Sequence, residues 1–410
     1  MSSDVASLDK IEASDWKPVT LGKIVRIVTD GITAADLSAL PKVHHYSLPA
    51  FDVGAGPEIG PGETIKSNKT IVPDDCVLFS KLNPRIPRIW RVSGAAAPHS
   101  YCSTEFWPLV AQGRSVDLDY LTQYLGSYGF LGHPSITPAS STNSHQRVDR
   151  KAFERFEFLL PPLNEQQRVA EVLRSVDDAI ASNQQCLTQA GSVRAALLQR
   201  HFHMAEWADG QPLPDGWEMP LLDAVATRGS GHTPNKKIDS YWNGGIKWVS
   251  LQDTKKLDQV YISTTAQQIS DDGIRNSSAV LHPDGVVVIS RDATVGRSAI
   301  TVGPMAVSQH FIAYRCGKML NNHYLYYWLQ RMKPVFERIG AGSTIKTIGL
   351  PFFKSLRIAL PPLEKQSQIA DVMLDADKAM MSAAAAIQSL RKAKAVVMAD
   401  LLSGHVRVPV

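Results

Sequence analysis

The chain has 410 residues, of which 44% are hydrophobic and 20% charged, and its formal net charge is +4. This length has room for two or three domains with cores of their own, and the composition is that of a globular protein. No apolar run is long enough for a membrane span, the four cysteines are too scattered for a zinc motif, and the charge neither demands nor excludes a polyanionic partner.

Residues 1–15 are expected to form a polar N-terminal tail. This segment lacks the basic-then-apolar pattern of a signal peptide. Because so few cysteines in a long chain suit a reducing compartment, we expect the protein in the cytoplasm.

A first α/β domain is predicted over residues 16–152. It consists of short β-branched runs separated by Gly, Pro, Asn and Asp, with a helix near residues 120–128. The segment 80–91 is its densest basic cluster, with Trp90 interleaved, and the loop 141–147 carries hydroxyl, amide and cationic groups that suit phosphates or base edges. The residues that we expect to contact nucleic acid here are Lys81, Asn83, Arg85, Arg88, Arg91, Thr142, Asn143 and Arg147. The competing interpretation of the cluster is a solvated basic strand.

A long spacer helix is predicted over residues 153–203. The Pro161-Pro162 pair cannot lie inside a helix, and Asn164 is the candidate N-cap, with Gln167 at capping-box spacing. From Val169 onward, apolar residues recur at alternating steps of four and three. This heptad seam is typical of a coiled coil.

A second α/β domain is predicted over residues 204–352, with another helix at 322–339. It repeats the anchors of the first domain: Trp217 corresponds to Trp16, and Tyr324 corresponds to Tyr120. The loops between the anchors differ almost completely. We expect nucleic-acid contacts at places analogous to those of the first domain, from Thr233, Lys236, Lys237, Arg291, Arg297, Ser343, Thr344 and Lys346.

Residues 353–410 repeat the first spacer helix at an offset of 200 residues and without a gap. Two seams in one chain are predicted to pair antiparallel, with Leu187 facing Met380, and with Arg194 and Lys394 lying over Met373 and Leu173. The predicted fold is therefore α/β, with two duplicated domains separated by two long helices that form an antiparallel coiled coil, in a pseudo-two-fold symmetric arrangement. The alternative is that each seam packs only on its own domain.

Two domains with one scaffold and different loops are typical of two binding heads for two different targets, since binding residues lie on loops that a rigid scaffold carries. Pseudo-two-fold symmetry with a fixed distance suits duplex DNA, whose half-sites mirror protein symmetry.

The motifs resemble those of a known family. The stretches Ser230-Gly-His-Thr-Pro234 and Tyr241-Trp242-Asn-Gly244-Gly-Ile-Lys-Trp248, and the Leu-Pro-Pro-Leu-x-x-Gln start of both helices, are similar to the specificity (S) subunit of type I restriction-modification enzymes. The resemblance covers nearly the whole chain. It implies two target-recognition domains that each read one half of a bipartite, asymmetric DNA site, and spacer helices that set the spacing and dock two methyltransferase subunits. The first domain lacks the Thr-Pro and Tyr-Trp pattern, so we expect it to read a different half-site.

The resemblance also implies a non-catalytic chain in a complex that methylates DNA and serves phage defence. The sequence has no Walker A loop, no methyltransferase motif, no His-Glu-x-x-His and no nuclease triad. No catalytic or metal-binding residue is therefore expected. S-adenosylmethionine, ATP and magnesium are expected on partner subunits, namely the methyltransferase subunits and the restriction subunits with translocase and nuclease activity.

Two other interpretations remain open from the residues alone. One is a bivalent scaffold whose heads bind proteins and not DNA. The other is an enzyme whose site lies in the variable parts of the two domains. A steep salt dependence of binding to random-sequence duplex distinguishes a DNA-binding protein from a protein scaffold.

Overall fold

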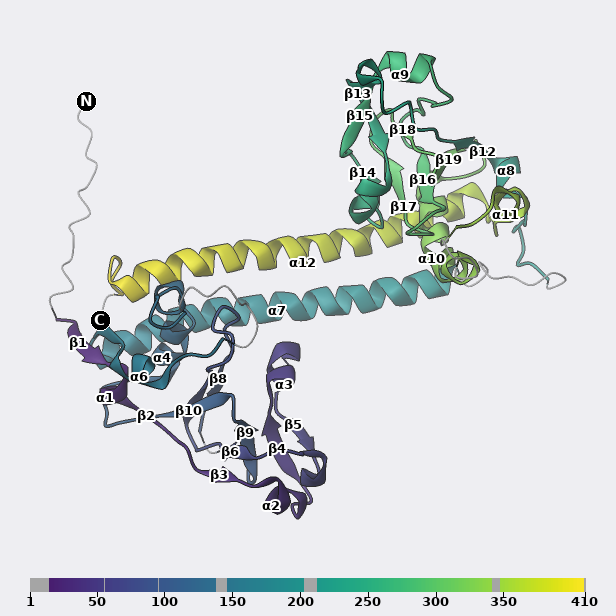
Figure 1. Cartoon of the computed structure of the whole chain (residues 1–410). Helices are drawn as coiled ribbons and strands as arrows, with labels where there is room; N and C mark the ends of the chain where they lie inside the picture. Colours follow the sequence, from purple (N-terminus) through teal and green to yellow (C-terminus); the bar gives the residue numbers. More distant parts are fainter. Residues whose placement is uncertain are drawn as a thin grey trace, which may run out of the picture. The chain divides into compact units, whose positions relative to one another are not determined.

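The computed structural model describes residues 15–54, 56–94, 96–137, 146–202, 212–340 and 347–408. The chain divides into two compact units, the first formed by Met1–Asn183 with Ala385–Val410 and the second by Gln184–Ala384. Each unit holds one domain together with about half of each long helix, α7 (Leu163–His201) and α12 (Leu363–Ser403) (Figure 1).

The domain of the first unit contains two main sheets. The four-stranded sheet has the order β2-β10-β7-β8 and is formed by β2 (Val25–Ile27), β10 (Phe106–Ala111), β7 (Cys76–Ser80) and β8 (Ile89–Val92). The five-stranded sheet has the order β3-β6-β9-β4-β5 and is formed by β3 (Gly31–Ile32), β6 (Lys69–Ile71), β9 (Ser100–Ser103), β4 (Val43–Tyr46) and β5 (Glu58–Gly60). A separate antiparallel pair joins the start of the domain to its end, β1 (Lys17–Thr20) with β11 (Glu157–Leu160).

The domain of the second unit repeats the strand order of the four-stranded sheet and differs in its other sheet. Its larger sheet has the order β12-β19-β16-β17-β14, with β12 (Ala226–Ser230), β19 (Phe311–Cys316), β16 (Val287–Ser290), β17 (Ser298–Thr301) and β14 (Tyr261–Ile262). Its smaller sheet has the order β15-β13-β18, with β15 (Gln267–Ile269), β13 (Trp242–Val249) and β18 (Ala306–Val307). The first four strands of the larger sheet stand in the same order as their counterparts in the first unit. The predicted duplication of one α/β domain is confirmed.

Short helices complete both domains. The first unit contains α1 (Leu21–Ile24), α2 (Ala34–Ser38), α3 (Leu48–Val53), η1 (Gly62–Thr64), α4 (Leu118–Leu125), α5 (Tyr128–Leu131) and α6 (Arg150–Arg155). The second contains α8 (Leu222–Val225), η3 (Asp239–Tyr241), η4 (Leu251–Lys256), α9 (Asp271–Arg275), α10 (Asn322–Gly340) and α11 (Leu350–Ser355). The helix expected near residues 120–128 is present but ends at Leu125, and α5 follows it. None of the helices in the described part of the chain is both long and apolar enough to cross a membrane.

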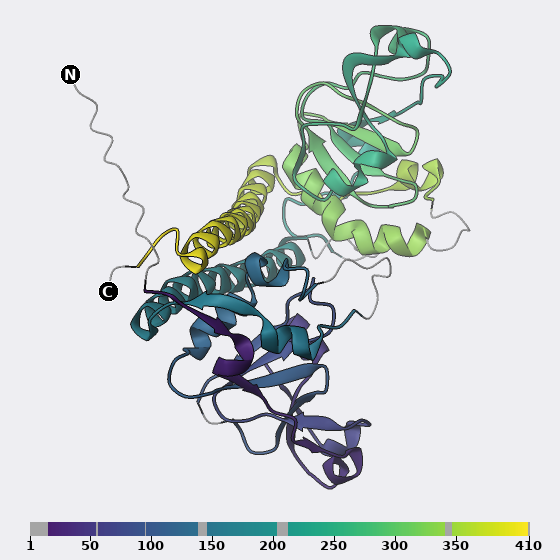
Figure 2. The ribbon, with the colours of Figure 1, turned by 60° about the vertical axis from the view of Figure 1, so that its left-hand side comes forward.

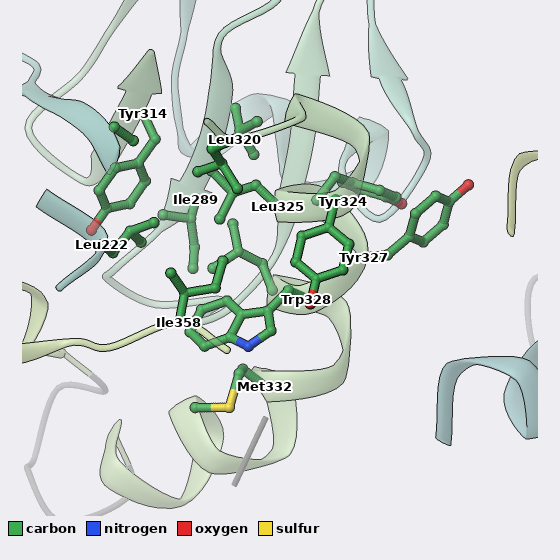
Figure 3. Packing of buried hydrophobic residues seen from close by; sticks show 14 of the residues in the cluster. Leu222, Ile289, Tyr314, Leu320, Tyr324, Leu325, Tyr327, Trp328, Met332 and Ile358 are labelled. Carbon is green, nitrogen blue, oxygen red and sulfur yellow. The ribbon is translucent and has the colours of Figure 1, made fainter. Parts of the chain in front are cut away.

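Each domain core continues onto the long helices of its own unit. In the second unit, α10 buries Tyr324 and Trp328 with Met332 and Ile358 (Figure 3), and the same cluster includes Met373 of α12. The aromatic run of α10 is therefore helix core. In the first unit, the corresponding cluster is shared by α4, the start of α7 and the end of α12. Each domain core therefore includes part of the long helices of its own unit.

A buried glutamine repeats at the start of both long helices and explains the last residue of the Leu-Pro-Pro-Leu-x-x-Gln motif. The Gln166 carboxamide accepts a hydrogen bond from the Asp117 amide at 2.8 Å and donates to the carbonyls of Ser115 and Pro161 at 2.9 and 2.8 Å. Gln366 forms the same three bonds in the second unit, to the Asn321 amide (2.9 Å) and to the carbonyls of Met319 (2.9 Å) and Pro361 (2.8 Å). One side chain thus joins the helix start, the Pro-Pro entry and the domain.

The two long helices run antiparallel within each unit. In the first unit, Leu173 of α7 shares a cluster with Val397 and Leu401 of α12, so the N-terminal part of one helix lies beside the C-terminal part of the other (Figure 2). In the second unit the roles are exchanged, because Leu197 near the end of α7 packs on the cluster that contains Ile369. The predicted antiparallel pairing is confirmed in both units.

The predicted register of this pairing is wrong by about one helical turn. A Cβ atom on Gly191 would lie 3.9 Å from the Met380 Cε, one turn along α7 from the predicted partner Leu187. If one helix is moved by about one turn along the other, apolar residues still meet along the seam. The apolar pattern alone therefore does not decide between the two registers. The deciding contacts are ion pairs: Arg194 binds Asp377, and Lys394 binds Asp177, where the sequence had placed both cations over apolar residues.

The prediction that Asn164 is the N-cap of the first long helix is also wrong. Helix α7 already begins at Leu163, and the Pro162 carbonyl accepts from the amides of Glu165 and Gln166, both at 3.0 Å. Asn164 lies inside the first turn, where its side chain accepts from the neighbouring Glu165 amide. The buried Gln166, and not Gln167, joins the helix start to the preceding segment.

Candidate nucleic-acid interface

The same loop scaffold follows β7 of the four-stranded sheet in the first unit and β16 of the five-stranded sheet in the second. In the first unit, the Ser80 amide donates to the Arg88 carbonyl, the Lys81 amide to the Glu105 carbonyl, and the Val148 amide to the Lys81 carbonyl, at 2.8 to 2.9 Å. In the second unit, the equivalent bonds run from Ser290 to Arg297, from Arg291 to His310 and from Ile348 to Arg291, also at 2.8 to 2.9 Å. Loops 81–88 and 291–297 are therefore the same element, as the predicted analogy required.

Two of the predicted arginines in the first domain form ion pairs with carboxylates of the same domain. Arg88 forms a two-pronged pair with Asp52 of α3, at 2.7 and 2.8 Å, and this hydrogen bonding raises the pKa of Arg88 and lowers that of Asp52. Arg91 binds Asp119 at 2.9 Å and Asp75 at 2.5 Å. A guanidinium with its donors committed to carboxylates has fewer left for a base or a phosphate.

Other predicted residues in this loop differ in what they present to solvent. Trp90 lies edge-on against Tyr46, with ring centroids 4.9 Å apart, so it belongs to the core. Asn83 adopts a left-handed conformation (φ 49°), and its Oδ1 is buried without a hydrogen-bond partner among the described residues. Lys81 is half-buried and Arg85 is exposed.

Arg147 lies beside the same loop and is half exposed. Its guanidinium binds Glu105 through two hydrogen bonds of 3.0 and 2.7 Å, and these bonds raise the pKa of Arg147. The backbone of Arg147 pairs with Leu82. Five further predicted residues lie outside the described ranges, namely Thr142, Asn143, Ser343, Thr344 and Lys346.

In the second domain, Arg291 and Arg297 are largely held by their own unit. Arg297 donates to the Thr254 carbonyl at 2.8 Å and lies 3.7 Å from Asp258. The Arg291 Nε is 3.8 Å from the Asp292 carboxylate, and Asp292 in turn binds the His310 ring at 2.9 Å. Arg291 and Asp292 therefore lie beside the loop that carries His310 and its neighbour Gln309, whereas Arg297 joins its own loop to η4.

A polar groove opens beside this loop and joins two adjoining cavities of about 250 and 350 Å³, which share Lys236, Gln252 and Gln267. We call it the amide groove, and its lining residues are Thr233, Lys236, Asp239, Trp242, Asn243, Trp248, Ser250, Leu251, Gln252, Gln267, Ser308, Gln309 and His310. The Thr233 hydroxyl donates to the Gln309 Oε1, which brings the Gly-His-Thr-Pro segment onto the loop after β18. The groove thus brings together residues 233–243, 248–252, 267 and 308–310.

The chemistry of the amide groove suits base edges. A carboxamide offers one donor and one acceptor side by side, which is the pattern that adenine presents in the major groove. Lys236 adds a cation at the rim, next to the exposed Lys237. Trp242 presents an aromatic surface, and its Nε1 donates to the Asn235 carbonyl at 3.2 Å.

The sequence predicted Thr233, Lys236 and Lys237 here but missed the four amides and His310. A partial signal was present, because Gln309 and His310 directly follow Ser308, and the spacing of Ser308 and Phe311 repeats that of Ser103 and Phe106 in the first domain. Within the described ranges, no group of three or more His, Cys, Asp or Glu side chains can hold a metal ion.

The sequence matches the family described as the type I restriction modification DNA specificity domain twice, over residues 13–190 and 214–390. The chain belongs to this specificity-domain family. Each match covers one recognition domain together with the following long helix up to about its last quarter. The duplication seen in the strand order is therefore a duplication of one specificity domain.

Individual relatives agree with this assignment. The chain is 27% identical over 163 residues to the MjaIX specificity subunit, a type I restriction enzyme subunit of Methanocaldococcus jannaschii, with 39% of this chain and 38% of that protein covered. It is 23% identical over 271 residues to a putative MjaX specificity subunit from the same organism, with 64% and 62% covered. The matched segments thus span less than two thirds of these relatives.

Two solved structures share the fold along nearly the whole chain. One comes from a study of complex assembly and conformational transition of a type I R-M system; it is 19% identical, covers 96% of this chain and 98% of that chain, and has a TM-score of 0.60. The other is the S subunit of a type I restriction-modification system from M. genitalium, at 12% identity, with 94% and 96% covered and a TM-score of 0.60. These likenesses support a specificity-domain fold for both halves.

Proposed function

We propose that this chain is the DNA-recognition subunit of a type I restriction-modification complex. Each recognition domain reads one half of a bipartite, asymmetric site, and the long helices set the spacing and dock two methyltransferase subunits. The observation that carries this proposal is the duplicated specificity domain, whose two copies share strand order and loop anchors but present different side chains at the same loop.

The residues of the candidate interface suit DNA binding, and we therefore assign catalysis to the partner subunits. The polar residues of this interface are amides, hydroxyls, cations, His310 and the single carboxylate of Asp239, and no metal-binding cluster is present among the described residues. The chain is therefore proposed to be non-catalytic, and S-adenosylmethionine, ATP and magnesium are proposed to act on the methyltransferase and restriction subunits. A complex with these substrates works where the chromosome is, so the proposed location is the cytoplasm.

Binding to random-sequence duplex at several salt concentrations tests the DNA role. We expect the logarithm of the binding constant to fall linearly with the logarithm of salt, by about 0.9 per phosphate contact. The double variant Lys236→Gln, Lys237→Gln should lose up to about two phosphate contacts, because both lysines are exposed at the groove. The slope should become shallower by the amount that corresponds to these contacts. Binding that is independent of salt, or that is absent at low salt, would favour the protein-binding scaffold.

The amide groove is expected to determine part of one half-site. Gln267→Ala and Gln309→Ala should each relax selection at one or two base pairs, with a loss of about 1 to 3 kcal/mol of discrimination against the wrong base. The matched control is Gln268→Ala, because Gln268 follows Gln267 on β15, points to the other face and does not line the groove. Unchanged selection in Gln267→Ala and Gln309→Ala, measured on a library of randomised half-sites, would remove the groove from the interface.

A further inference from the structure

A carboxylate at one position of each long helix joins three helices. Asp177 of α7 accepts a hydrogen bond from the Gln123 Nε2 of α4 at 2.9 Å, and the Lys394 Nζ of α12 lies 2.6 and 2.7 Å from its two oxygens. Asp377 of α12 accepts from the Tyr327 hydroxyl of α10 at 2.7 Å and from the Arg194 Nε of α7 at 2.5 Å. We call these the two carboxylate junctions, and each lies entirely within its own unit.

The two junctions occupy equivalent positions in the duplicated chain. Asp177 and Asp377, like Arg194 and Lys394, are separated by the 200-residue offset of the repeat, and Gln123 and Tyr327 each stand three residues after the shared tyrosine anchor. The carboxylate is the same in both copies, whereas its two partners differ in kind but not in role. The amide and the phenol both donate to the carboxylate, and the lysine and the arginine both supply the cation.

The residues of the second junction are largely buried within their unit. The side chains of Asp377 and Arg194 are 15% and 19% exposed, and Tyr327 is buried. Burial and the hydrogen bond to Asp377 raise the pKa of Tyr327, so its hydroxyl remains a donor. In Figure 3 the Tyr327 ring projects to the edge of the labelled core cluster, away from the aliphatic side chains.

The hydrogen bonds of the two carboxylate junctions restrict how each domain can rotate on its long helices. The apolar contacts between a recognition domain and its long helices resist separation, but burial of apolar surface is non-directional. A hydrogen bond to a charged group depends on distance and angle, and it stabilises by about 1.5 to 3 kcal/mol. A carboxylate that binds the domain on one side and the opposite long helix on the other therefore restricts rotation of the domain about the helix axis.

We propose that Asp177 and Asp377 are positioning residues that fix the angle of each recognition domain on the long helices of its own unit, and thereby restrict the half-site spacing that the protein accepts. This inference rests on the proposed function for its DNA consequence only. The angle itself is a property of each unit and is measured without DNA.

The test removes the domain side of each junction and leaves the ion pair between the long helices intact. Tyr327→Phe deletes one hydroxyl, and Gln123→Leu deletes one amide. The matched controls are Tyr314→Phe and Tyr120→Phe, because both tyrosines are fully buried and their hydroxyls have no hydrogen-bond partner among the described residues. Binding is measured to duplexes whose half-sites are separated by the native spacer and by one or two base pairs more or fewer.

We expect the wild-type chain and both controls to bind the native spacer selectively. In Tyr327→Phe and Gln123→Leu, the ratio of binding constants between native and altered spacers should fall about tenfold, the equivalent of one charged hydrogen bond. Asp377→Asn should retain much of the selectivity, because an amide oxygen still accepts from Tyr327, whereas Asp377→Leu should lose it. Binding weakened equally at every spacer would mean that the junctions only stabilise the fold.

A second readout separates this inference from the proposed function. Spin labels at Ser278→Cys and Ala379→Cys, in a Cys186→Ser background, report the distance between the second domain and α12 within one unit. All three positions are exposed. Tyr327→Phe should broaden this distance distribution, and Tyr314→Phe should not. An unchanged distribution overturns the positioning role whether or not the chain binds DNA, and a wild-type chain without sequence selectivity overturns the proposed function alone.

Discussion

Arg407→Met is expected to lower the free energy of unfolding of the first unit by about 3 to 5 kcal/mol, since it leaves a buried carboxylate without its cation. Glu165 at the start of α7 is 1% exposed and receives the Arg407 Nη2 at 2.6 Å, the Arg407 Nε at 2.5 Å and the Trp16 Nε1 at 3.1 Å. The guanidinium carbon also lies 5.7 Å from the centre of the Trp16 ring. In the variant, the Trp16 donor alone remains.

Thermal unfolding of the full chain, with hydrogen exchange of residues 16–20 and 163–173, measures this effect. The control is Arg391→Met, because Arg391 is an exposed arginine of α12. The double variant Glu165→Gln, Arg407→Met should recover part of the lost free energy of unfolding, because the neutral amide still accepts from Trp16 and carries no buried charge. A variant as stable as Arg391→Met would show that the C-terminal segment does not hold the start of α7.

Gln366→Leu is expected to destabilise the second unit by about 3 kcal/mol or more, because each buried polar group left unpaired costs about 1 to 3 kcal/mol. The substitution removes the acceptor of the Asn321 amide and the donors of the Met319 and Pro361 carbonyls. Gln166→Leu should have the same effect on the first unit only, since its bonds are confined to that unit.

The matched controls for this pair are Gln368→Leu and Gln167→Leu, which alter exposed glutamines one or two residues further along each helix. Hydrogen exchange resolves the two units, so each substitution should increase exchange in its own unit. Equal exchange in both units, or no change relative to the controls, would contradict the role assigned to the buried glutamines.

Features that depend on repetition were predictable from the sequence. The duplication of the anchors, the two long helices and their antiparallel pairing all follow from periodic or repeated residues, and the structure confirms each of them. The register was not predictable, because two registers one turn apart both place apolar residues along the seam. Asp177 and Asp377 decide between them, and a search for apolar periodicity passes over charged residues.

The candidate site was less predictable than the fold, for a different reason. Arg88 lies 36 residues from its partner Asp52, and Arg91 lies 28 residues from Asp119, so the chain gives no local sign that these cations are held by carboxylates. The amide groove joins segments around Lys236, Gln252 and Gln309, which only the fold brings together. A cluster of cations in sequence is visible without a structure, whereas a cluster of amides in space is not.

Mapping of methylated bases in the host genome tests whether the two domains read two half-sites independently. It compares cells with the intact gene, cells without it, and cells in which residues 217–350 are replaced by the corresponding domain of a relative. We expect deletion to abolish one bipartite methylation motif, and we expect the replacement to change one half of that motif and to leave the other half intact. Methylation that survives deletion, or a replacement that changes both halves, would contradict independent reading of two half-sites by the two domains.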